Sequence, residues 1–419
     1  MMYNKIIVYS QYIERNMIIM RILYIVNMDE NNRKGLFMAT HEKIKEIMKC
    51  HPENEYEIIS VQFCDKGIFR FLKKLTGKKT YDRTSDEFIY DGVKYRKVYL
   101  SIDLKSKEIE KKDDDQSRFK EFFEQCSDSI EKCDMISCHW GYPHGRIAYW
   151  ANKIYKKPYI VTYHGSDVHT MPFADESIRK KVLEVMNNAV QNIFVSRKLM
   201  ETARELGHTK DNCTASRNGV NAEKFGIISE DKIKEIKEKY KISGKVVGFA
   251  GAVNQIKRAD RMDVIFESIK NQDPDTEYTY LVVGDGPLKS SLESRCKEKN
   301  LNAVFTGNQD TDGVRDFMNV MDVMIIPSRR EGFGCVVTEA NACGASVVGS
   351  GAGGIPEAIG IEDNVINDGE NFEKRMAKRI IDVIHSEINR KELSDFTRNN
   401  FSWEKIAEIE YKFYTEGEK

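Results

Sequence analysis

The chain of 419 residues carries 65 basic and 66 acidic side chains, and it is too long for one ordinary hydrophobic core, so we expect two domains. The balanced charge gives no support for a nucleic-acid-binding protein, because such proteins carry a strongly basic surface. Nine cysteines occur without a C-x-x-C pair, which indicates neither a disulfide framework nor a zinc site and favours a reducing cytosol.

The N-terminus lacks the apolar core of a secretory signal, and no run of about 18 apolar residues that could span a membrane occurs. The apolar, β-branched segment 21–27 predicts the first buried strand, so residues 1–19 are expected to form an extension that precedes the fold. A rhythm of strands and helices follows, which is typical of a parallel sheet with helices on both faces. The expected strands of this sheet are residues 21–27, 55–63, 134–140, 158–165 and 191–196.

The composition changes around residues 226–244, where apolar residues recur only at helical spacing within a charged segment. We therefore predict an α/β protein with two doubly wound domains, residues 1–235 and 236–402, and a C-terminal helix over 403–419 that packs back on the first. In such sheets ligands bind beyond the carboxyl ends of the strands, so a cleft between the domains is the expected site. The expected strands of the second sheet are residues 245–251, 278–286, 303–308, 322–328 and 345–350.

The segment EGFGCVVTEA, Glu331–Ala340, places two carboxylates near the start of a short helix. Gly332 and Gly334 allow a ligand to approach the backbone, and the unpaired N–H groups of a helix N-terminus attract a diphosphate. Glu339, more than one turn into the helix, could accept hydrogen bonds from two neighbouring hydroxyls, as on a ribose, with Glu331 nearer the group that the diphosphate carries. The alternative is a charge that stabilises the helix N-terminus and an unrelated surface glutamate.

The stretch PSRREGFGCVVTEANACGASVVGSGAGGIPEAI, residues 327–359, resembles the family-4 retaining glycosyltransferases, whose mark is a pair of glutamates separated by seven residues. The resemblance covers most of the chain from residue 20, with VTYHGSDVH (161–169), NGVNAEKF (218–225) and VGDGP (283–287) in the order of that family. It implies the GT-B fold, in which the first of two Rossmann-like domains binds mainly the acceptor and the second binds the nucleotide sugar.

Carried over residue by residue, the resemblance implies that Glu339 holds the ribose hydroxyls and that the backbone of Gly332, Phe333 and Gly334 meets the sugar and the diphosphate. Glu331 would position or electrostatically support the donor sugar. Retaining glycosidases use a carboxylate nucleophile close to a second acid, and no such pair is evident here. A same-face displacement, in which the leaving phosphate takes the acceptor proton, fits the family better.

The family also has a basic pair after the first strand of its second domain. Here the sequence is GAVNQIKR, in which Lys257 matches the family's lysine but Ala252 stands where its arginine is expected. We expect Arg258, or an arginine of residues 329–330, to supply the missing charge beside the diphosphate. The alternative for Lys257 and Arg258 is a solvated basic turn.

In the first domain the motif HGSD follows an expected strand and therefore points into the cleft. His164 resembles the family's histidine near the reacting sugar, and the alternative is a structural histidine. Asp167 is expected on the acceptor side or as a helix N-cap. His139 and Tyr142, in the loop HWGYPHG, either shape the acceptor site or pack structurally, and Gly35 stands where the family often has paired glycines.

Two further glycine motifs carry alternatives. Gly284 and Gly286 of GDGP are expected to turn tightly near the nucleotide base, unless this is a plain turn, whereas Asn218–Gly219 is expected to serve as a structural turn. GSGAGG matches G-x-G-x-x-G and, taken alone, proposes a dinucleotide site and an NAD oxidoreductase. No clear long strand with an acidic end follows it, and under the resemblance Gly353 and Gly354 approach the diphosphate.

The segment KGIFRFLKKLTGKK, residues 66–79, has apolar residues at helical spacing, basic residues around them and no acid. Such a helix can rest on an anionic membrane face, and the alternative is a helix that packs this stripe on the core. We hypothesise peripheral attachment at the inner face of the cell membrane, since many acceptors of the family are lipid-linked. The apolar residues are Ile68, Phe71, Leu72 and Leu75, and the basic residues are Lys66, Arg70, Lys73, Lys74, Lys78 and Lys79.

The resemblance thus implies a cytoplasmic retaining transferase that moves a sugar from a nucleotide-diphosphate donor, UDP by the family's habits, to a glycan or lipid-linked acceptor in bacterial surface polysaccharide assembly. Lys257 and the helix N-terminus would stabilise the leaving diphosphate. A nucleotide-sugar epimerase of the same fold and a non-catalytic nucleotide-sugar-binding protein stay open as alternatives. We expect no cofactor and no metal, and Asp113–Asp115, which mimics a D-x-D metal motif, lies in a charged run that reads as a solvated linker.

Overall fold

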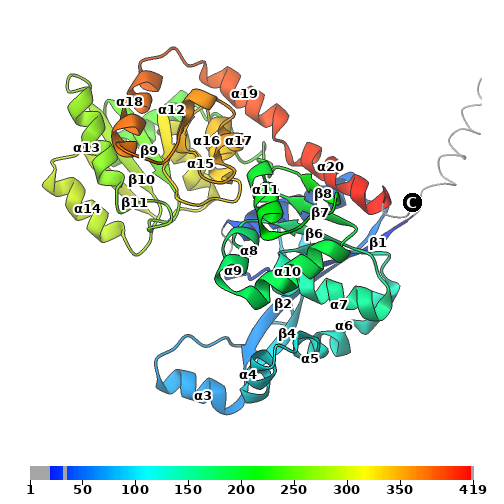
Figure 1. Ribbon diagram of the computed structural model, residues 1–419. Helices are drawn as coiled ribbons and strands as arrows, with labels where there is room; N and C mark the ends of the chain where they lie inside the picture. Colours follow the sequence, from blue (N-terminus) through cyan, green and yellow to red (C-terminus); the bar gives the residue numbers. More distant parts are fainter. Residues whose placement is uncertain (1–18, 32–34, 417–419) are drawn as a thin grey trace, which may run out of the picture.

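The computed structural model describes residues 19–31 and 35–416, so the extension expected over residues 1–19 lies, apart from its last residue, outside the described residues. Two α/β domains lie side by side, each built on one sheet with helices on both faces (Figure 1). This architecture confirms the predicted α/β class with two Rossmann-like units. Among the described residues, no helix has both the length and the apolar character needed to cross a lipid bilayer.

The first sheet has eight strands in the order β3-β4-β2-β1-β5-β6-β7-β8, all parallel to their neighbours except β3 with β4. Its strands are β1 (Arg21–Val26), β2 (Glu55–Asp65), β3 (Glu87–Tyr90), β4 (Val93–Ile102), β5 (Met135–His139), β6 (Tyr159–Tyr163), β7 (Gln191–Phe194) and β8 (Cys213–Ala215). Every residue of β1 after Arg21 is buried, because helices cover both faces of the sheet. The order of strands reverses between β1 and β5, which places a ligand crevice at their carboxyl ends.

The second sheet has six parallel strands in the order β11-β10-β9-β12-β13-β14. They are β9 (Lys245–Ala250), β10 (Tyr278–Val283), β11 (Ala303–Gly307), β12 (Val323–Ile326), β13 (Ser346–Ser350) and β14 (Val365–Ile366). This is the strand order of a dinucleotide-binding domain, with its reversal between β9 and β12. The loops after β9 and β12 are therefore the expected place for a nucleotide.

Helices connect the strands and cover both sheets. Around the first sheet they are α2 (Leu36–Cys50), α3 (Gly67–Leu75), α4 (Leu104–Lys111), α5 (Asp115–Arg118), α6 (Lys120–Lys132), the π-helical turn η1 (Gly141–Gly145), α7 (Arg146–Tyr155), α8 (Ser166–His169), α9 (Met171–Ala174), α10 (Glu176–Asn188) and α11 (Arg197–Leu206). Later in the chain they are α12 (Glu230–Tyr240), α13 (Met262–Gln272), α14 (Lys289–Glu298), α15 (Thr311–Val320), α16 (Cys335–Ala342), α17 (Ile355–Ile359), the 3₁₀ turn η2 (Glu362–Asn364), α18 (Phe372–Ile384), α19 (Arg390–Asn400) and α20 (Trp403–Glu416).

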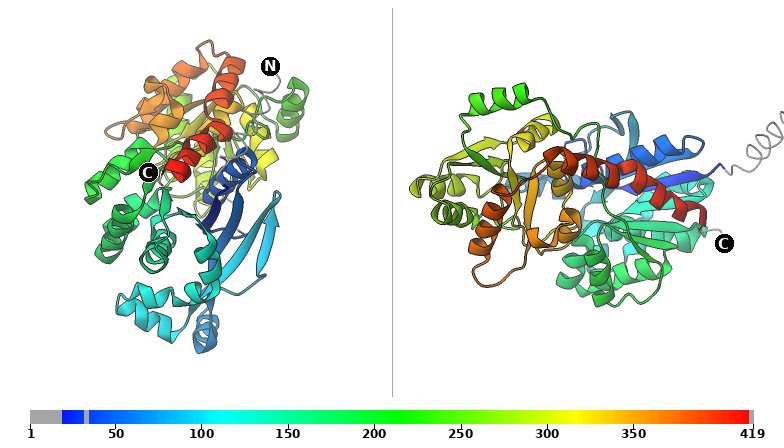
Figure 2. Two further views of the ribbon diagram at one scale, coloured as in Figure 1. Left: turned by 90° about the vertical axis from the view of Figure 1, so that its right-hand side faces the viewer. Right: turned by 90° about the horizontal axis from the view of Figure 1, so that it is seen from above.

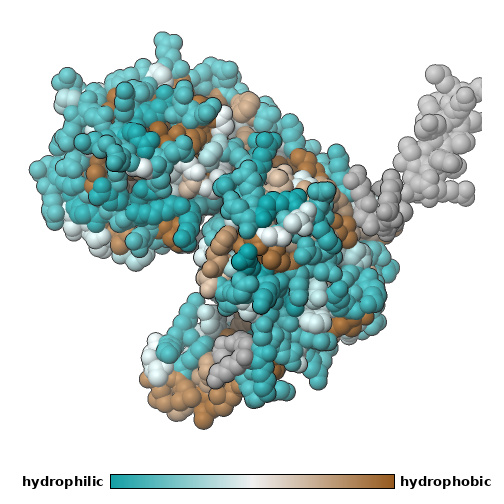
Figure 3. All heavy atoms as spheres, viewed as in Figure 1, coloured by the Kyte–Doolittle hydropathy of each residue, from teal (hydrophilic) through white to brown (hydrophobic). Residues whose placement is uncertain are grey.

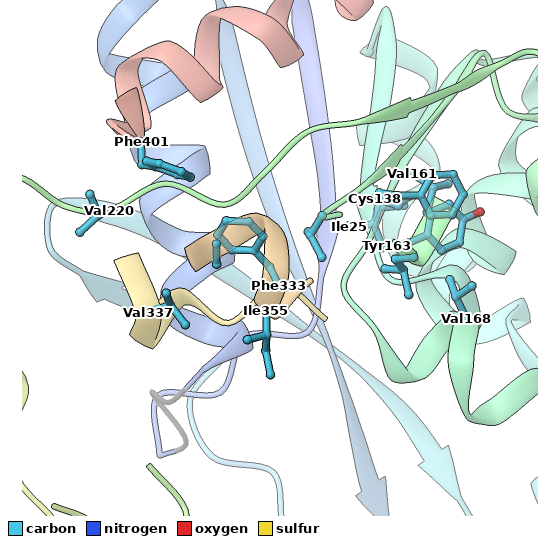
Figure 4. Packing of buried hydrophobic residues seen from close by; sticks show 14 of the residues in the cluster. Ile25, Cys138, Val161, Tyr163, Val168, Val220, Phe333, Val337, Ile355 and Phe401 are labelled. Atoms are coloured by element: carbon cyan, nitrogen blue, oxygen red, sulfur yellow. The ribbon is translucent and has the colours of Figure 1, made fainter. Parts of the chain in front are cut away.

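An apolar cluster continues from one domain into the other. Phe333, in the loop between β12 and α16, is buried among Val337, Ile355 and Phe401 (Figure 4). Its ring centroid lies 6.5 Å from that of Phe401, which stands between α19 and α20. The backbone N–H of Val220 donates to the Phe401 carbonyl at 2.7 Å, so the segment that leaves the first sheet is tied to the returning C-terminal segment.

Helix α20 returns from the second sheet and lies along α2 of the first (Figure 2). Lys43 of α2 and Glu410 of α20 form an ion pair in which both side chains are almost completely buried. The Tyr414 hydroxyl hydrogen-bonds with the hydroxyls of Ser137 at 3.0 Å and Tyr24 at 3.2 Å. The last helix therefore belongs to the packing of the first sheet.

The interpretation of the charged run that ends in Asp113–Asp115 as a solvated linker holds only in part, because residues 112–114 are exposed but Asp115 is not. Asp115 is buried, forms an ion pair with Arg146 and accepts a hydrogen bond from Trp150 Nε1 at 3.1 Å. Asp113 pairs with Lys181 of α10. These carboxylates are bound by basic and aromatic side chains, and they tie this segment to α7 and α10.

Candidate active site

A cleft of about 580 Å³ lies between the two domains, at the carboxyl ends of both sheets. The start of α2, the connecting segment 218–225 and the loops after β9, β10 and β12 contribute to its wall. The predicted site residues that line it are Gly35, His164, Lys257, Gly284, Glu331, Phe333, Gly334 and Glu339. The predicted residues that do not line it are His139, Tyr142, Asp167, Arg258, Gly286, Gly332, Gly353 and Gly354.

Lys257 and Glu331 are brought together by two neighbouring strands, because Lys257 lies in the loop after β9 and Glu331 in the loop after β12. Their side chains form an ion pair and remain 23% and 20% exposed. The backbone N–H of Lys257 donates to Asn254 Oδ1 at 3.0 Å, which holds the turn. An anionic ligand in the cleft can therefore replace Glu331 as the partner of the Lys257 ammonium and leave the carboxylate for another group.

The loop that carries Glu331 is held against the first domain. A Cβ atom at Gly332 would overlap the carbonyl oxygen of His164, so only glycine fits there. The hydroxyl of Ser196 donates to the Gly332 carbonyl at 2.9 Å. Glu357 accepts hydrogen bonds from two backbone N–H groups at the start of α11, at 2.6 and 3.2 Å. These contacts describe a closed arrangement of the two domains around the loop.

Gly353 and Gly354 support this loop from behind. A Cβ atom at Gly353, whose φ is +56°, would overlap the carbonyl oxygen of Glu331, and one at Gly354 would crowd the Phe333 backbone. The structure therefore places both glycines against the loop rather than along the cleft. With the Phe333 side chain buried in the shared core, they fix the course of the loop backbone.

His164 and His139 form a pair at the ends of β6 and β5. Nε2 of His164 lies 2.9 Å from Nδ1 of His139, and burial together with the nearby Lys43 ammonium holds the pKa of His164 well below its ordinary value. Both rings are therefore neutral, and one of the two donates to the other. Since Nε2 of His164 is engaged, Nδ1 is the atom left for a ligand hydroxyl, as donor or acceptor according to the tautomer.

Asp167 has a structural role in this loop. Its carboxyl group is buried and accepts from the backbone N–H groups of Gly165 at 2.8 Å and of His164 and Gly141 at 3.2 Å. Burial raises its pKa to about 6 even though these three donors favour the ionised form. Asp167 thus orients the strand-end loop that presents His164.

Glu339 projects from α16 into the cleft and faces Glu42 of α2. Burial raises the pKa of Glu339 to about 7, and the Glu42 carboxylate adds to this shift. Both oxygens of Glu42 are engaged, since it accepts from Asn221 Nδ2 and from Lys224 Nζ, each at 2.9 Å. No hydrogen bond to the carboxyl group of Glu339 is found among the described residues, so it is available to a ligand.

Arg258 does not contribute its charge to the cleft. Its Nε donates to the Pro327 carbonyl at 2.9 Å and its guanidinium pairs with Asp368, so the side chain is buried beneath the loop after β12. Arg329 is also engaged, because its two terminal nitrogens bind the two oxygens of Asp260 at 2.6 and 2.8 Å. Neither of these two arginines therefore replaces the positive charge of the family's arginine, at whose position this chain has Ala252.

The glycines of the strand-end turns have different settings. Gly284, with φ +137°, lines the cleft, and a Cβ atom there would overlap the Gly251 carbonyl. Gly286 lies against Val253, where a Cβ atom would also be too close to the backbone. Gly35, with φ +50°, precedes the first residue of α2, so the N-terminus of this helix faces the cleft from the first domain.

The remaining acceptor-side prediction, Tyr142, lies apart from the cleft. Its ring is partly buried on the core of the first domain, with Lys181 Nζ 5.7 Å from the ring centroid. His139 is buried behind His164 and supports the His164 imidazole ring, rather than contacting a ligand itself. Over residues 19–31 and 35–416, no group of three or more His, Cys, Asp or Glu side chains is placed to hold a metal ion.

Sequence reasoning missed the part of the site that α2 and the connecting segment contribute. Glu42, Asn221 and Lys224 line the cleft, as does Asn218, which was expected to be only a structural turn. Asn218 Nδ2 donates to Cys335 Sγ at 3.3 Å, next to the start of α16. The available signal was the density of amide and charged residues in NGVNAEKF, a segment that joins two domains and so must cross the cleft.

Two family models match the chain one after the other. The model described as Glycosyltransferase Family 4 matches residues 95–224, and the model described as Glycosyl transferases group 1 matches residues 231–400. The first match ends at the connecting segment, and the second contains the loops with Lys257, Glu331 and Glu339. The first match thus covers most of β4 and all of β5 to β8 of the first sheet, and the second match covers all strands of the second sheet.

Curated proteins with similar sequences are named as glycosyltransferases or synthases. The uncharacterized glycosyltransferase MJ1178 of Methanocaldococcus jannaschii is 27% identical over 68% of this chain and 76% of its own length. The putative teichuronic acid biosynthesis glycosyltransferase TuaC of Bacillus subtilis is 26% identical over 62% and 64%. The N-acetyl-alpha-D-glucosaminyl L-malate synthase of Bacillus anthracis is 26% identical over 55% and 59%. The alignments thus span between 59% and 76% of these relatives.

Solved structures with the same arrangement of domains include Anabaena Alr3699/HepE in complex with UDP, with a TM-score of 0.72 and 15% identity over 95% of this chain and all of that one. The sucrose-phosphate synthase from Thermosynechococcus elongatus has a TM-score of 0.70 and 16% identity over 94% of this chain and 98% of that one. At these identities the likeness establishes the fold, which is GT-B.

Proposed function

Because the chain is a glycosyltransferase with the GT-B fold, we propose that it transfers a sugar from a UDP-sugar donor to a hydroxyl group of a glycan or lipid-linked acceptor, with retention of the anomeric configuration. The observation that carries this proposal is the arrangement of Lys257, Glu331 and Glu339 on two strand-end loops and one helix of the same cleft. His164 faces them from the first domain. The cation of Lys257 suits the diphosphate of a nucleotide sugar, and the carboxylate of Glu339 suits its ribose. The carboxylate of Glu331 and the neutral imidazole of His164 suit the donor sugar.

In the proposed reaction the donor lies along the loop before α16. The ribose hydroxyls donate hydrogen bonds to Glu339. The diphosphate takes the place of Glu331 beside Lys257 and accepts hydrogen bonds from the backbone N–H groups at the start of the helix. The anomeric C–O bond to the diphosphate breaks as the acceptor oxygen bonds to the same face of the sugar. The acceptor proton passes to the departing phosphate oxygen, and Lys257 stabilises the negative charge that develops there.

Glu331, once released from Lys257, lies where the sugar ring is expected and supports its developing positive charge. The neutral His164 ring supplies a hydrogen bond to a sugar hydroxyl through Nδ1. The closed contacts of Gly332 and Glu357 with the first domain exclude water from this space. Nothing in this scheme needs a bound metal or a cofactor.

The nucleotide and the biological setting are supported by relatives alone. HepE binds UDP in its crystal structure, and TuaC is named for teichuronic acid biosynthesis. We propose UDP as the nucleotide and bacterial surface polysaccharide assembly as the setting. The protein would act in the cytoplasm at the inner face of the cell membrane, with contact through residues 66–79.

The proposal predicts that nucleotide sugars stabilise the protein and that one of them donates to an acceptor with retained configuration. A thermal-shift panel of UDP-, GDP- and ADP-sugars selects the donor, and incubation with a candidate acceptor followed by NMR of the product reports the anomeric configuration. An inverted product would refute retention. Conversion of the donor sugar without any acceptor would instead show an epimerase, and binding without nucleotide release would show a non-catalytic protein.

Replacing Glu339 by glutamine is expected to weaken UDP binding about tenfold or more, since a hydrogen bond to a charged group contributes roughly 1.5–3 kcal/mol. The pKa of Glu339 is about 7 in the free protein, and the ribose hydroxyls favour its ionised form. Binding by the unmodified protein should therefore strengthen as the pH rises from 6 to 8. Isothermal titration at several pH values measures both effects.

The glutamine variant is also the control for the titration of UDP itself. Protonation of the UDP phosphate changes the binding affinity of both proteins with pH in the same way. Only the difference between the two pH dependences therefore reports the titration of Glu339. Equal UDP affinity of the two proteins at pH 8 would contradict the ribose assignment.

A further inference from the structure

Among residues 19–31 and 35–416, helix α3 stands out as an apolar surface that no other part of the chain covers. Ile68, Phe71, Leu72 and Leu75 are 61%, 60%, 47% and 67% exposed, and no residue of the helix is buried. The alternative that this stripe packs on the core is therefore wrong. Figure 3 shows these side chains gathered as one hydrophobic tip at the lower end of the molecule, where Figure 1 shows α3 projecting beyond β2 and β4.

The opposite side of α3 is fastened to the protein. Nζ of Lys73 donates to both oxygens of the buried Asp65 carboxylate, at 2.7 and 2.9 Å, and it lies 5.0 Å from the ring centroid of Tyr81. The Asp65 carboxylate also accepts from the backbone N–H of Tyr81 at 2.8 Å. Lys73 thus holds α3 in place and is not among the cations that a ligand outside the protein could meet.

The free cations lie at the end of α3 and just beyond it. Lys74, Lys78 and Lys79 are exposed, and no acidic partner for them is found in the described part of the chain. Arg70, by contrast, pairs with Asp82 at 2.7 Å. An exposed apolar stripe with unpaired lysines beside it matches an anionic bilayer, in which acyl chains accept the apolar side chains and headgroups meet the ammonium groups.

The position of α3 relates this surface to the cleft. It follows the carboxyl end of β2, and the cleft lies at the carboxyl ends of strands in the same sheet. The space-filling view shows a hollow between the α3 tip and the second domain (Figure 3). A surface that contacts α3 therefore meets the molecule at the end of the first sheet where the cleft also lies.

We propose that α3 inserts Ile68, Phe71, Leu72 and Leu75 into an anionic lipid bilayer and that the lysines at its end hold the headgroups. Docked in this way, the protein presents the acceptor side of its cleft to the membrane, so a lipid-linked acceptor can enter without leaving the bilayer. This second statement rests on the proposed glycosyl transfer, whereas the docking of α3 does not. The tip is convex, a shape that fluid lipid accommodates without a preformed groove.

The test is sedimentation of the full chain with phosphatidylcholine vesicles that contain or lack phosphatidylglycerol. We expect binding to the anionic vesicles that weakens with salt, and at least tenfold weaker binding by a Phe71→Ser/Leu75→Ser variant. A Lys74→Glu/Lys78→Glu/Lys79→Glu variant should lose the preference for phosphatidylglycerol. The matched control is Phe396→Ser, which removes a side chain that is 60% exposed on α19 of the second domain and should bind like the unmodified protein.

Thermal unfolding and UDP binding of each variant show that the cleft is intact, since the exposed face of α3 contributes no residue to it. No sedimentation of the unmodified protein with anionic vesicles would overturn the proposal, as would equal binding by the Phe71→Ser/Leu75→Ser variant. Oligomers in size-exclusion chromatography that depend on Phe71 and Leu75, without vesicle binding, would overturn it in favour of a protein contact. Vesicle binding without transfer activity would support the docking and contradict the proposed function alone.

Discussion

Lys257→Met is expected to lower kcat by a factor of about 10²–10³, the usual loss when one preorganised group that stabilises a developing anion is removed. Among the described residues, the lysine and arginine side chains that line the cleft are Lys257 and Lys224, and Lys224 is bound to Glu42 at 2.9 Å. Arg258, which could have shared the role, is buried against Pro327 and Asp368. The charge on the leaving diphosphate therefore falls to Lys257, and steady-state kinetics with a UDP-sugar and a soluble acceptor measure the loss.

A double-mutant cycle separates this role from a structural one, because Lys257 also holds Glu331 in an ion pair. If Lys257 stabilises the diphosphate, Lys257→Met should still reduce kcat strongly in a Glu331→Gln background. If it only orients Glu331, the double variant will be no slower than Glu331→Gln alone, and the assignment fails. Lys378→Gln removes an exposed charge of α18 that does not line the cleft and serves as the control, with an expected change below about twofold.

Much of the fold could be predicted because its strands are buried parallel strands. Residues 22–26 and 280–283 are continuous apolar runs, and β1 and β10 begin at the expected positions. The hairpin of β3 and β4 was missed although Asp91–Gly92 marks its turn. β8 and β14 have three and two residues, too few for any local pattern to show.

The residues at strand ends could be predicted for the same reason. The topology places the loops after β6, β9 and β12 at one cleft. His164, Lys257 and Glu331 therefore lie near one another whatever the rotamers of their side chains. Arg258 could not be placed, because a turn with φ +58° sends its side chain under the loop, where its guanidinium lies 4.1 Å from the ring centroid of Phe372. Contacts so distant in sequence leave no local trace.

Helix α2 shows a second limit of the sequence. Glu42, Lys43 and Lys45 lie within about one turn of α2 as ordinary charged helix residues, yet their surroundings differ completely. Glu42 lines the cleft, Lys43 is buried against Glu410, and Lys45 lies at the surface with Asp91. Helical periodicity predicts a polar side of such a helix. The C-terminal helix was expected to pack back on the first domain, but the sequence does not show that it covers Lys43 and leaves Glu42 and Lys45 uncovered.

That return is the basis of the second large effect. Glu410→Gln is expected to destabilise the first domain by about 3–5 kcal/mol, because it leaves the Lys43 ammonium buried without a counter-charge. Both side chains are at most 1% exposed, so water cannot replace the lost partner. The loss of stability should lower the urea concentration at which the first domain unfolds, as measured by circular dichroism. Because the chain has two domains, each unfolding transition is fitted separately.

The matched control replaces the pair rather than breaking it. Lys43→Met/Glu410→Leu fills the same space with apolar side chains and should restore most of the stability, since well-packed apolar residues often replace a buried ion pair without loss. Activity provides a second readout, because burial, with the Lys43 ammonium adding to it, holds the pKa of His164 well below its ordinary value. Since burial remains when the lysine is lost, His164 should stay neutral in the double variant and the pH profile of kcat should keep its shape. A Glu410→Gln variant as stable as the unmodified protein would contradict this role of the ion pair, and α20 would then be held by its tyrosines.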